Sequence, residues 1–218
     1  MKKIFARMGV AVMISAMAFA LSACGSDSGS SAGDEPGASS GSSESGSMTD
    51  SRDGQKYKTV KIGKMVWMAE NMNYKTAASK CYDDKSENCE KYGRLYNWDD
   101  AMAACPNGWH LPSQQEFEDL FEAAEKAGDD AGIVLKSTSG WIDEGEGTDV
   151  LKFGAEPSGW YDPEEEAFLE EGVVARLWSS EEENATDSYY AHFDYAYDNV
   201  EMYMHEKNSM FTVRCVKN

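Results

Sequence analysis

The fold of this chain is decided at Ser113-Gln114-Gln115-Glu116, a stretch that predicts the start of a helix. In such a capping box the Ser113 hydroxyl accepts a hydrogen bond from the amide of Glu116, and the Glu116 carboxylate accepts one from the amide of Ser113. Gly128 is placed to end the helix. Apolar residues follow at helical spacing and form one stripe that we expect to lie in the core: Phe117, Leu120, Phe121 and Ala124.

A strand pattern and a second helix precede this segment. Residues 57–62 alternate between apolar and polar side chains, Gly63-Lys64 offers a turn, and residues 65–68 continue as a second strand. This pattern predicts a β-hairpin. Asn97 is expected to cap a short helix that runs through Ala104.

Beyond the capping-box helix the pattern changes twice. Residues 137–172 are rich in Gly, Asp, Glu and Pro and predict long irregular loops. Alternation then returns in four segments, which we expect to form an antiparallel meander: 176–179, 189–195, 200–205 and 210–216. The predicted fold class is therefore α+β, with two early helices, long irregular central loops and an antiparallel sheet meander at the C-terminus.

The first 24 residues predict a bacterial lipoprotein. An apolar run over residues 10–21 is too short to span a bilayer, and Leu21-Ser22-Ala23-Cys24 forms a lipobox directly after it. We expect residues 1–23 to be removed as a signal peptide and Cys24 to carry the lipid; an ordinary secretory signal is the alternative. The basic residues expected before the apolar run are present: Lys2, Lys3 and Arg7.

Composition divides the rest of the chain into two parts. Residues 24–56 are mostly Ser, Gly, Asp and Glu, so we expect a disordered tether. Residues 57–218 are enough for one domain. An Asp directly after the lipidated cysteine would resemble the signal that retains lipoproteins in the inner membrane. Because Gly25 stands here, we expect the outer membrane or cell surface.

The charge of the chain excludes one class of partner. The formal net charge is −19. Because the three charged residues ahead of Cys24 are all basic, the mature chain carries 17 Lys and Arg against 39 Asp and Glu. Such a surface repels nucleic acid and anionic lipid, so membrane contact is expected through the lipid alone.

Four cysteines remain once Cys24 is assigned to lipid, and they allow three pairings. Cys81 and Cys89 flank a short polar loop that a disulfide would close. Cys105 with Cys215 would then tie the middle of the domain to its last strand. A zinc site is the competing interpretation, but the chain has no CxxC pair and no clustered His.

Several motifs of rare residues occur in a recognisable order. They resemble the Fibrobacter succinogenes major paralogous domain, a family of exported bacterial proteins, over nearly all of residues 57–218. That family has no established activity, so the resemblance implies none. The main motifs are Trp67-Met68-Ala69-Glu70-Asn71-Met72-Asn73-Tyr74, Tyr92-Gly93-Arg94-Leu95-Tyr96-Asn97-Trp98, Cys105-Pro106-Asn107-Gly108-Trp109-His110-Leu111-Pro112-Ser113 and Val213-Arg214-Cys215-Val216-Lys217.

A second, more distant resemblance is to the C-type-lectin-like fold, which includes the formylglycine-generating enzyme group. There a segment like residues 108–117 opens a helix and a strand like residues 213–215 closes the domain. A disulfide between Cys105 and Cys215 would also fit that fold.

Lectin-like domains often bind Ca²⁺ and sugar through a Glu-Pro-Asn loop, which gives two candidate sites. Glu156-Pro157-Ser158 resembles that loop, although Ser158 replaces the amide, and a solvated acidic loop is the alternative. Aromatic rings in the central loops could stack on sugar faces, or pack beneath the loops to hold them. The candidate calcium ligands are Glu156, Glu181, Glu182 and Asn184, and the candidate sugar-binding residues are Trp141, Trp160 and Tyr161.

Catalytic residues are scarce. His110 lies in the capping motif and is expected to be structural, and a Ser179 or Ser180 pair with His192 lacks a nucleophile elbow. The formylglycine-generating enzymes use a cysteine pair with copper, whereas the cysteines here are assigned to lipid or disulfides. We therefore expect a non-enzymatic, lipid-anchored surface module without a cofactor other than calcium, which binds polysaccharide or an envelope protein. A purely structural envelope protein is the alternative, and an enzyme comes third.

Overall fold

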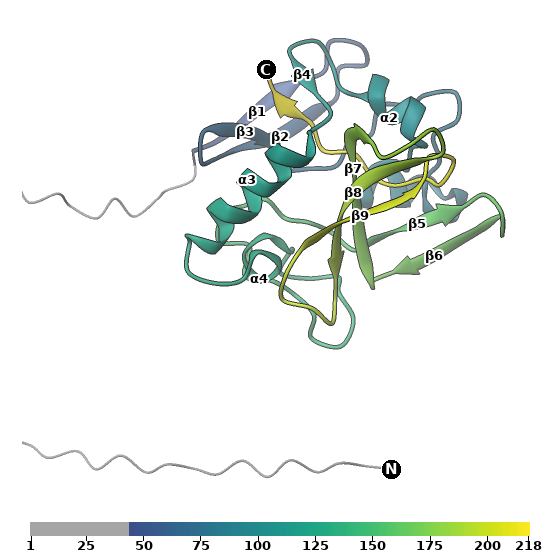
Figure 1. Ribbon diagram of the computed structural model, residues 1–218. Helices are drawn as coiled ribbons and strands as arrows, with labels where there is room; N and C mark the ends of the chain where they lie inside the picture. The colour runs from purple at the N-terminus through teal and green to yellow at the C-terminus, as the bar shows by residue number, and fades with distance from the viewer. Residues whose placement is uncertain (1–43) are drawn as a thin grey trace, which may run out of the picture. The chain divides into compact units, whose positions relative to one another are not determined.

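The computed structural model describes residues 44–218 and confirms the α+β class (Figure 1). The predictions for the signal peptide, for Cys24 and for the tether up to residue 43 lie outside the described residues. In Figure 1 a five-stranded sheet lies at the top, a three-stranded meander below it and a two-stranded hairpin at the right. The helices are α1 (Ser86–Tyr92), α2 (Trp98–Ala104), α3 (Gln114–Glu125) and α4 (Ala131–Leu135), with a short 3-10 helix at Tyr82–Asp84.

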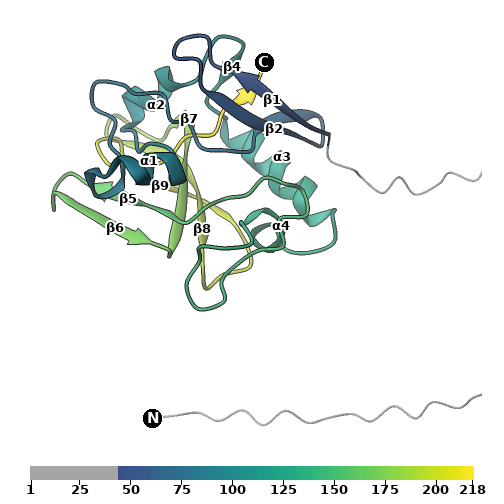
Figure 2. The ribbon, with the colours of Figure 1, turned by 180° about the vertical axis from the view of Figure 1, so that it is seen from behind.

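The five-stranded sheet brings both ends of the domain together. Its order is β1-β2-β3-β10-β4, and all neighbours are antiparallel. Figure 2 shows β1, β2 and β4 at the top of the domain, beside the C-terminus. The last strand lies between β3 and β4 because Val216 pairs with Trp67 on one side and with His110 on the other. The predicted hairpin is confirmed as β2 and β3. The strands of this sheet are β1 (Ser45–Thr49), β2 (Lys56–Ile62), β3 (Met65–Met68), β4 (Trp109–His110) and β10 (Val216–Lys217).

The folded domain begins earlier than the composition predicted. Strand β1 lies inside residues 24–56, which we expected to be disordered, and it pairs in register with β2 from Ser45 opposite Val60 onward. The turn after it is fixed because the buried carboxylate of Asp50 accepts hydrogen bonds from Arg52. Backbone pairing does not need apolar side chains, and this is why a Ser- and Gly-rich segment forms an edge strand.

Both predicted helices are confirmed together with their caps. The Ser113 hydroxyl accepts from the amide of Glu116 at 3.3 Å, and the Glu116 carboxylate accepts from the amide of Ser113 at 2.8 Å. The Asn97 side chain caps α2 by accepting from the amide of Asp100. The helices α1 and α4 were not predicted. Both are short, with 7 and 5 residues, and no side-chain cap begins either of them.

The meander consists of three strands rather than four. Strands β7 (Val174–Glu182), β8 (Asp187–Asp194) and β9 (Glu201–Glu206) confirm the first three predicted segments. Most of the fourth segment makes only single bridges, such as Phe211 with Tyr96, and continuous pairing returns at β10.

The predicted irregular region 137–172 contains an unpredicted hairpin, β5 (Ser158–Asp162) and β6 (Ala167–Glu171). Strand β6 is at most half-buried. Its acidic, partly exposed residues therefore gave no clear apolar alternation.

Helix α3 packs between the five-stranded sheet and the meander. Its buried Phe117 contacts Trp67 of β3, with the ring centroids 5.5 Å apart. Two disulfides, Cys81–Cys89 and Cys105–Cys215, confirm the predicted pairing. The second of them holds the segment after α2 against the segment that leads into β10.

Candidate functional site

The two tryptophans predicted to bind sugar lie inside the domain. Trp141 is 5% exposed and Trp160 is 7% exposed. The Trp141 indole donates to the Ser137 hydroxyl, and the Trp160 indole donates to the Glu170 carboxylate. The expectation that these rings present a face to a ligand is therefore wrong, because they pack beneath the chain that carries them. Tyr161 is half-buried, and its ring packs against Phe168.

The structure does not bring the four candidate calcium ligands together. Glu181 accepts from Gln114, Glu182 pairs with Lys207, and Asn184 accepts from the amides of its own turn. Glu156 lies in a cavity with none of these three in its lining. Within residues 44–218 no group of three or more His, Cys, Asp or Glu side chains is arranged to hold a metal ion.

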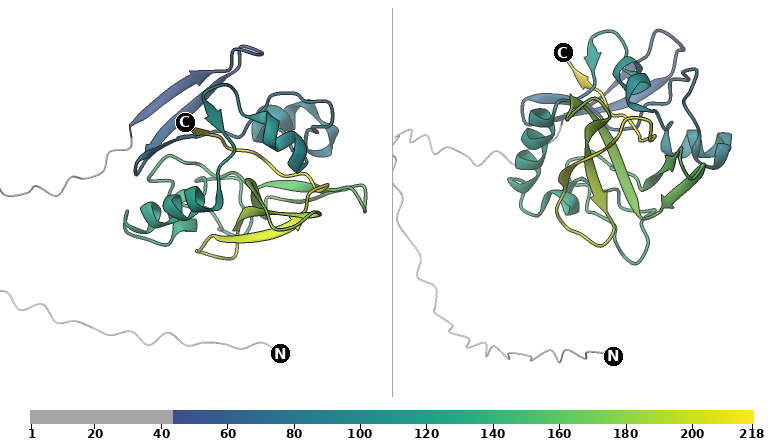
Figure 3. Two further views of the ribbon diagram at one scale, coloured as in Figure 1. Left: turned by 45° about the horizontal axis from the view of Figure 1, so that its top comes forward. Right: turned by 45° about the vertical axis from the view of Figure 1, so that its right-hand side comes forward.

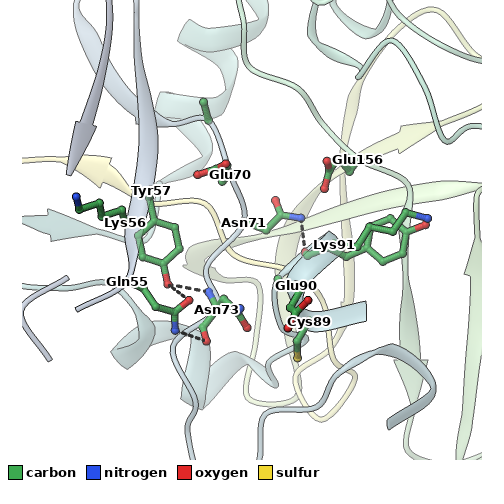
Figure 4. Close-up of a pocket in the computed structure, with 13 residues that line it drawn as sticks. Gln55, Lys56, Tyr57, Glu70, Asn71, Asn73, Cys89, Glu90, Lys91 and Glu156 are labelled. Carbon is green, nitrogen blue, oxygen red and sulfur yellow. Dashed lines mark hydrogen bonds between the residues drawn. The ribbon is translucent and has the colours of Figure 1, made fainter. Parts of the chain in front are cut away.

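One cavity, of about 180 Å³, lies between the β2–β3 hairpin and α1. Figure 4 shows Gln55 and Tyr57 on one side of it and Lys91 and Glu156 on the other, with Asn71 between them. Gly93 belongs to its wall and must be glycine, since a Cβ there would lie 2.7 Å from the carbonyl oxygen of Met72. Two of the motifs that carry the family resemblance thus contribute to the lining, through residues 69–71, 73 and 92–93.

Asn71, which lines this cavity, belongs to a buried hydrogen-bond network around Arg214. The Arg214 guanidinium is fully buried and donates to the Asn71 side chain at 2.8 Å and to the carbonyls of Phe153 and Gly154. Burial lowers the pKa of Arg214 to about 10, so the side chain stays charged at neutral pH. Burial likewise raises the pKa of Glu156. The Asn71 amide is therefore already used by this network, since it also donates to the carbonyl of Tyr92.

A larger hollow, of about 270 Å³, lies beside the turn between β8 and β9. Tyr197 and Tyr203 are 63% and 46% exposed, so two phenol rings of this hollow face solvent. No residue of this hollow was among the candidate binding residues. The sequence feature that could have indicated this hollow is the pair Tyr197, in the polar turn, and Tyr203, in the strand that follows it. The lining consists of His192, Asp194, Tyr197, Asn199, Glu201 and Tyr203.

The strand register fixes the geometry of this hollow, which we call the β8–β9 pocket. His192 lies opposite Glu201 on the paired strands, and the His192 and Tyr203 rings meet edge to face at 5.4 Å. The Glu201 carboxylate accepts from the Asn199 amide at 2.9 Å and from the Tyr203 hydroxyl. Asp194 accepts from the amide of Ala196 through Oδ1. The polar groups are thus held in place by the turn itself.

Neither His192 nor His110 forms a catalytic pair with a serine of the described chain. The hydroxyl of the buried Ser179 accepts from the amide of Glu181, and His192 lies opposite Arg176, so the Ser179–His192 pair is not formed. Burial lowers the pKa of His192, which keeps the ring neutral at pH 7. His110 is held between Glu116 and Asn218, as expected of a structural residue.

The fold and its hollows define a disulfide-tied α+β domain with a small polar pocket at a hairpin turn. A family model described as the Fibrobacter succinogenes major domain matches residues 60–217. Because the match covers more than half of the chain, the protein belongs to this family. No curated protein and no solved structure gave a significant match, so the lectin-like resemblance stays a prediction. Among residues 44–218, no helix is both long and apolar enough to cross a membrane.

Proposed function

We propose that this protein is a lipid-anchored, non-enzymatic module of the cell envelope that binds polysaccharide through the β8–β9 pocket. The observation that carries the proposal is the exposure of Tyr197 and Tyr203 beside oriented polar side chains. Flat rings stack on the apolar faces of sugars, and fixed polar groups beside them give orientation. The proposed binding site therefore lies at the β8–β9 turn, whereas the sequence had suggested the central loops.

Exposed apolar surface gathers at the same hairpin. Six large apolar or aromatic side chains are exposed in residues 44–218, and two of them, Tyr197 and Tyr203, line the β8–β9 pocket. Large exposed apolar groups that gather in one place mark interaction sites more often than single ones do. At about 270 Å³ the pocket is near the lower end of ordinary ligand sites, which start at about 300 Å³. It therefore suits one or two sugar units of a chain.

The position of the pocket suits an anchored protein. The first strand, β1, lies at the top of Figure 1, and the turn between β8 and β9 lies at the bottom. The views in Figure 3 show the same separation. The expected lipid precedes β1 in the sequence, so the pocket lies at the end of the domain away from the attachment point. A membrane on the side of the attachment point therefore leaves the pocket open to a polymer.

The test is retention on insoluble polysaccharides by the detergent-solubilised full chain. Tyr197→Ala/Tyr203→Ala should weaken retention by about 1–2 kcal/mol for each ring. The free energy of unfolding should change little, because both side chains are substantially exposed. The matched control is Met204→Ala, which removes a similarly exposed side chain from the opposite face of β9.

The control separates the proposal from the structural alternative. Equal retention of both variants on every polymer, or no retention of the unaltered chain, would refute the pocket as a polysaccharide site. A chain that binds no polymer would favour a structural envelope protein.

A further inference from the structure

The hydrogen-bonding groups of the β8–β9 pocket are mainly acceptors. The Asp194 Oδ2 atom lies 3.8 Å from Nε2 of His192, beyond hydrogen-bond distance. Each Glu201 oxygen accepts one hydrogen bond, although a carboxylate oxygen can accept two. All four carboxylate oxygens, including Oδ1 of Asp194 with its single donor, therefore have capacity for donors supplied from outside.

The lining of the pocket contains no positively charged side chain. No Lys or Arg is among its six lining residues. Arg176 lies opposite His192 on β7, but it is only 9% exposed, and its guanidinium donates to Glu170 at 2.8 Å. The Glu170 carboxylate, which is not part of the pocket lining, therefore compensates the positive charge of Arg176. Lys136 is not part of the lining, but its buried ammonium donates to the carbonyls of Asp194 and Tyr197 at 3.1 Å. Burial lowers the pKa of His192 and favours its neutral ring, so the charged side chains that line the pocket are the carboxylates of Asp194 and Glu201.

We propose that the β8–β9 pocket selects uncharged, hydroxyl-rich polysaccharides and rejects polyanionic ones. This inference rests on the proposed function and names its ligand class. A sugar hydroxyl donates to a carboxylate in a charge-assisted hydrogen bond, the stronger kind. A ligand carboxylate or sulfate has only acceptors and meets two like charges, which is unfavourable at an interface.

The experiment compares polymers that share a backbone and differ in charge. The pairs are hydroxyethyl cellulose with carboxymethyl cellulose, and methyl-esterified with de-esterified polygalacturonate. Affinity electrophoresis of the full chain in detergent gives the apparent affinity for each polymer. Salt is kept at about 0.15 M or above, where a Debye length of roughly 8 Å screens the general repulsion from the acidic surface.

The variant Asp194→Asn/Glu201→Gln removes the two charges and keeps the shape of both side chains. In the unaltered chain the neutral member of at least one pair should bind roughly tenfold tighter than the anionic member, a difference of about 1.4 kcal/mol. In the variant the two members should differ by less than about threefold, a difference of about 0.65 kcal/mol. Glu118→Gln/Glu125→Gln is the matched control, since it removes two exposed charges from α3 and should leave the preference unchanged.

Three results would overturn the inference. Binding of the anionic member as tightly as the neutral one would refute the selectivity and leave the polysaccharide site intact. A loss of preference in the α3 control as well would assign the preference to overall charge. Absence of binding to all four polymers would refute the proposed preference for neutral polysaccharides. The proposed function would still stand if insoluble polysaccharides are retained and the retention depends on Tyr197 and Tyr203.

Discussion

At the scale of single residues, Arg214 shows why part of the family motif exists. A fully buried guanidinium needs hydrogen-bond acceptors for its N–H groups, and the Asn71 side chain and two backbone carbonyls are those acceptors. Asn71 also donates to the carbonyl of Tyr92 at 2.9 Å, so one amide joins β3, α1 and the C-terminal segment. Asn71, a motif residue that lines the smaller cavity, therefore stabilises the domain.

Asn71→Ala should lower the free energy of unfolding by about 2–4 kcal/mol, because it leaves a buried charged donor and a buried carbonyl without partners. Urea denaturation under non-reducing conditions measures the change. Asn73→Ala is the control, since the recorded hydrogen bonds of Asn73 use its backbone and survive the substitution. Similar losses in both variants would contradict the assigned role of Asn71.

At the scale of elements, the sequence predicted what local chemistry determines. The capping box, the Asn97 cap and the alternation in β2, β7 and β8 depend on neighbouring residues, and all of these elements form. Strand β1 depends instead on pairing with β2, and the β5–β6 hairpin depends on packing against the meander. Neither leaves a pattern in its own residues.

The same distinction explains the candidate site. The sequence showed that Trp141 and Trp160 lie in polar surroundings, which suggested exposure. Their burial follows from contacts with distant residues, such as the Arg176 guanidinium 4.3 Å from the Trp160 ring. The pocket at Tyr197 and Tyr203 depends on how the hairpin turn folds back, which alternation alone does not predict.

The two disulfides should differ in their contribution to stability. Cys105 and Cys215 are 110 residues apart and Cys81 and Cys89 are 8 apart. In the chain-entropy model, Cys105→Ala/Cys215→Ala lowers the free energy of unfolding by about 4.8 kcal/mol, and Cys81→Ala/Cys89→Ala by about 2.5 kcal/mol. Denaturant unfolding of both variants measures these losses. An equal or reversed order would contradict the account.

At the scale of the whole molecule, the proposed function combines a lipid anchor at Cys24 with a pocket at the end of the domain opposite β1 (Figure 1). Cys24→Ser should abolish incorporation of labelled fatty acid and release the chain from membranes, because the tether contains no other apolar anchor. Detergent phase partitioning after a high-salt wash tests this. Partitioning of the Ser variant into the detergent phase would refute the lipoprotein assignment.

The central claim is that the β8–β9 pocket binds neutral polysaccharide, and amide chemical-shift mapping tests it most directly. Neutral oligosaccharides prepared from a retained polymer are titrated into the isotope-labelled full chain. The account predicts saturable shifts centred on residues 192–203 and absent in Tyr197→Ala/Tyr203→Ala. Shifts centred on the cavity at Asn71 and Glu156, or on the central loop around Trp141, would contradict it.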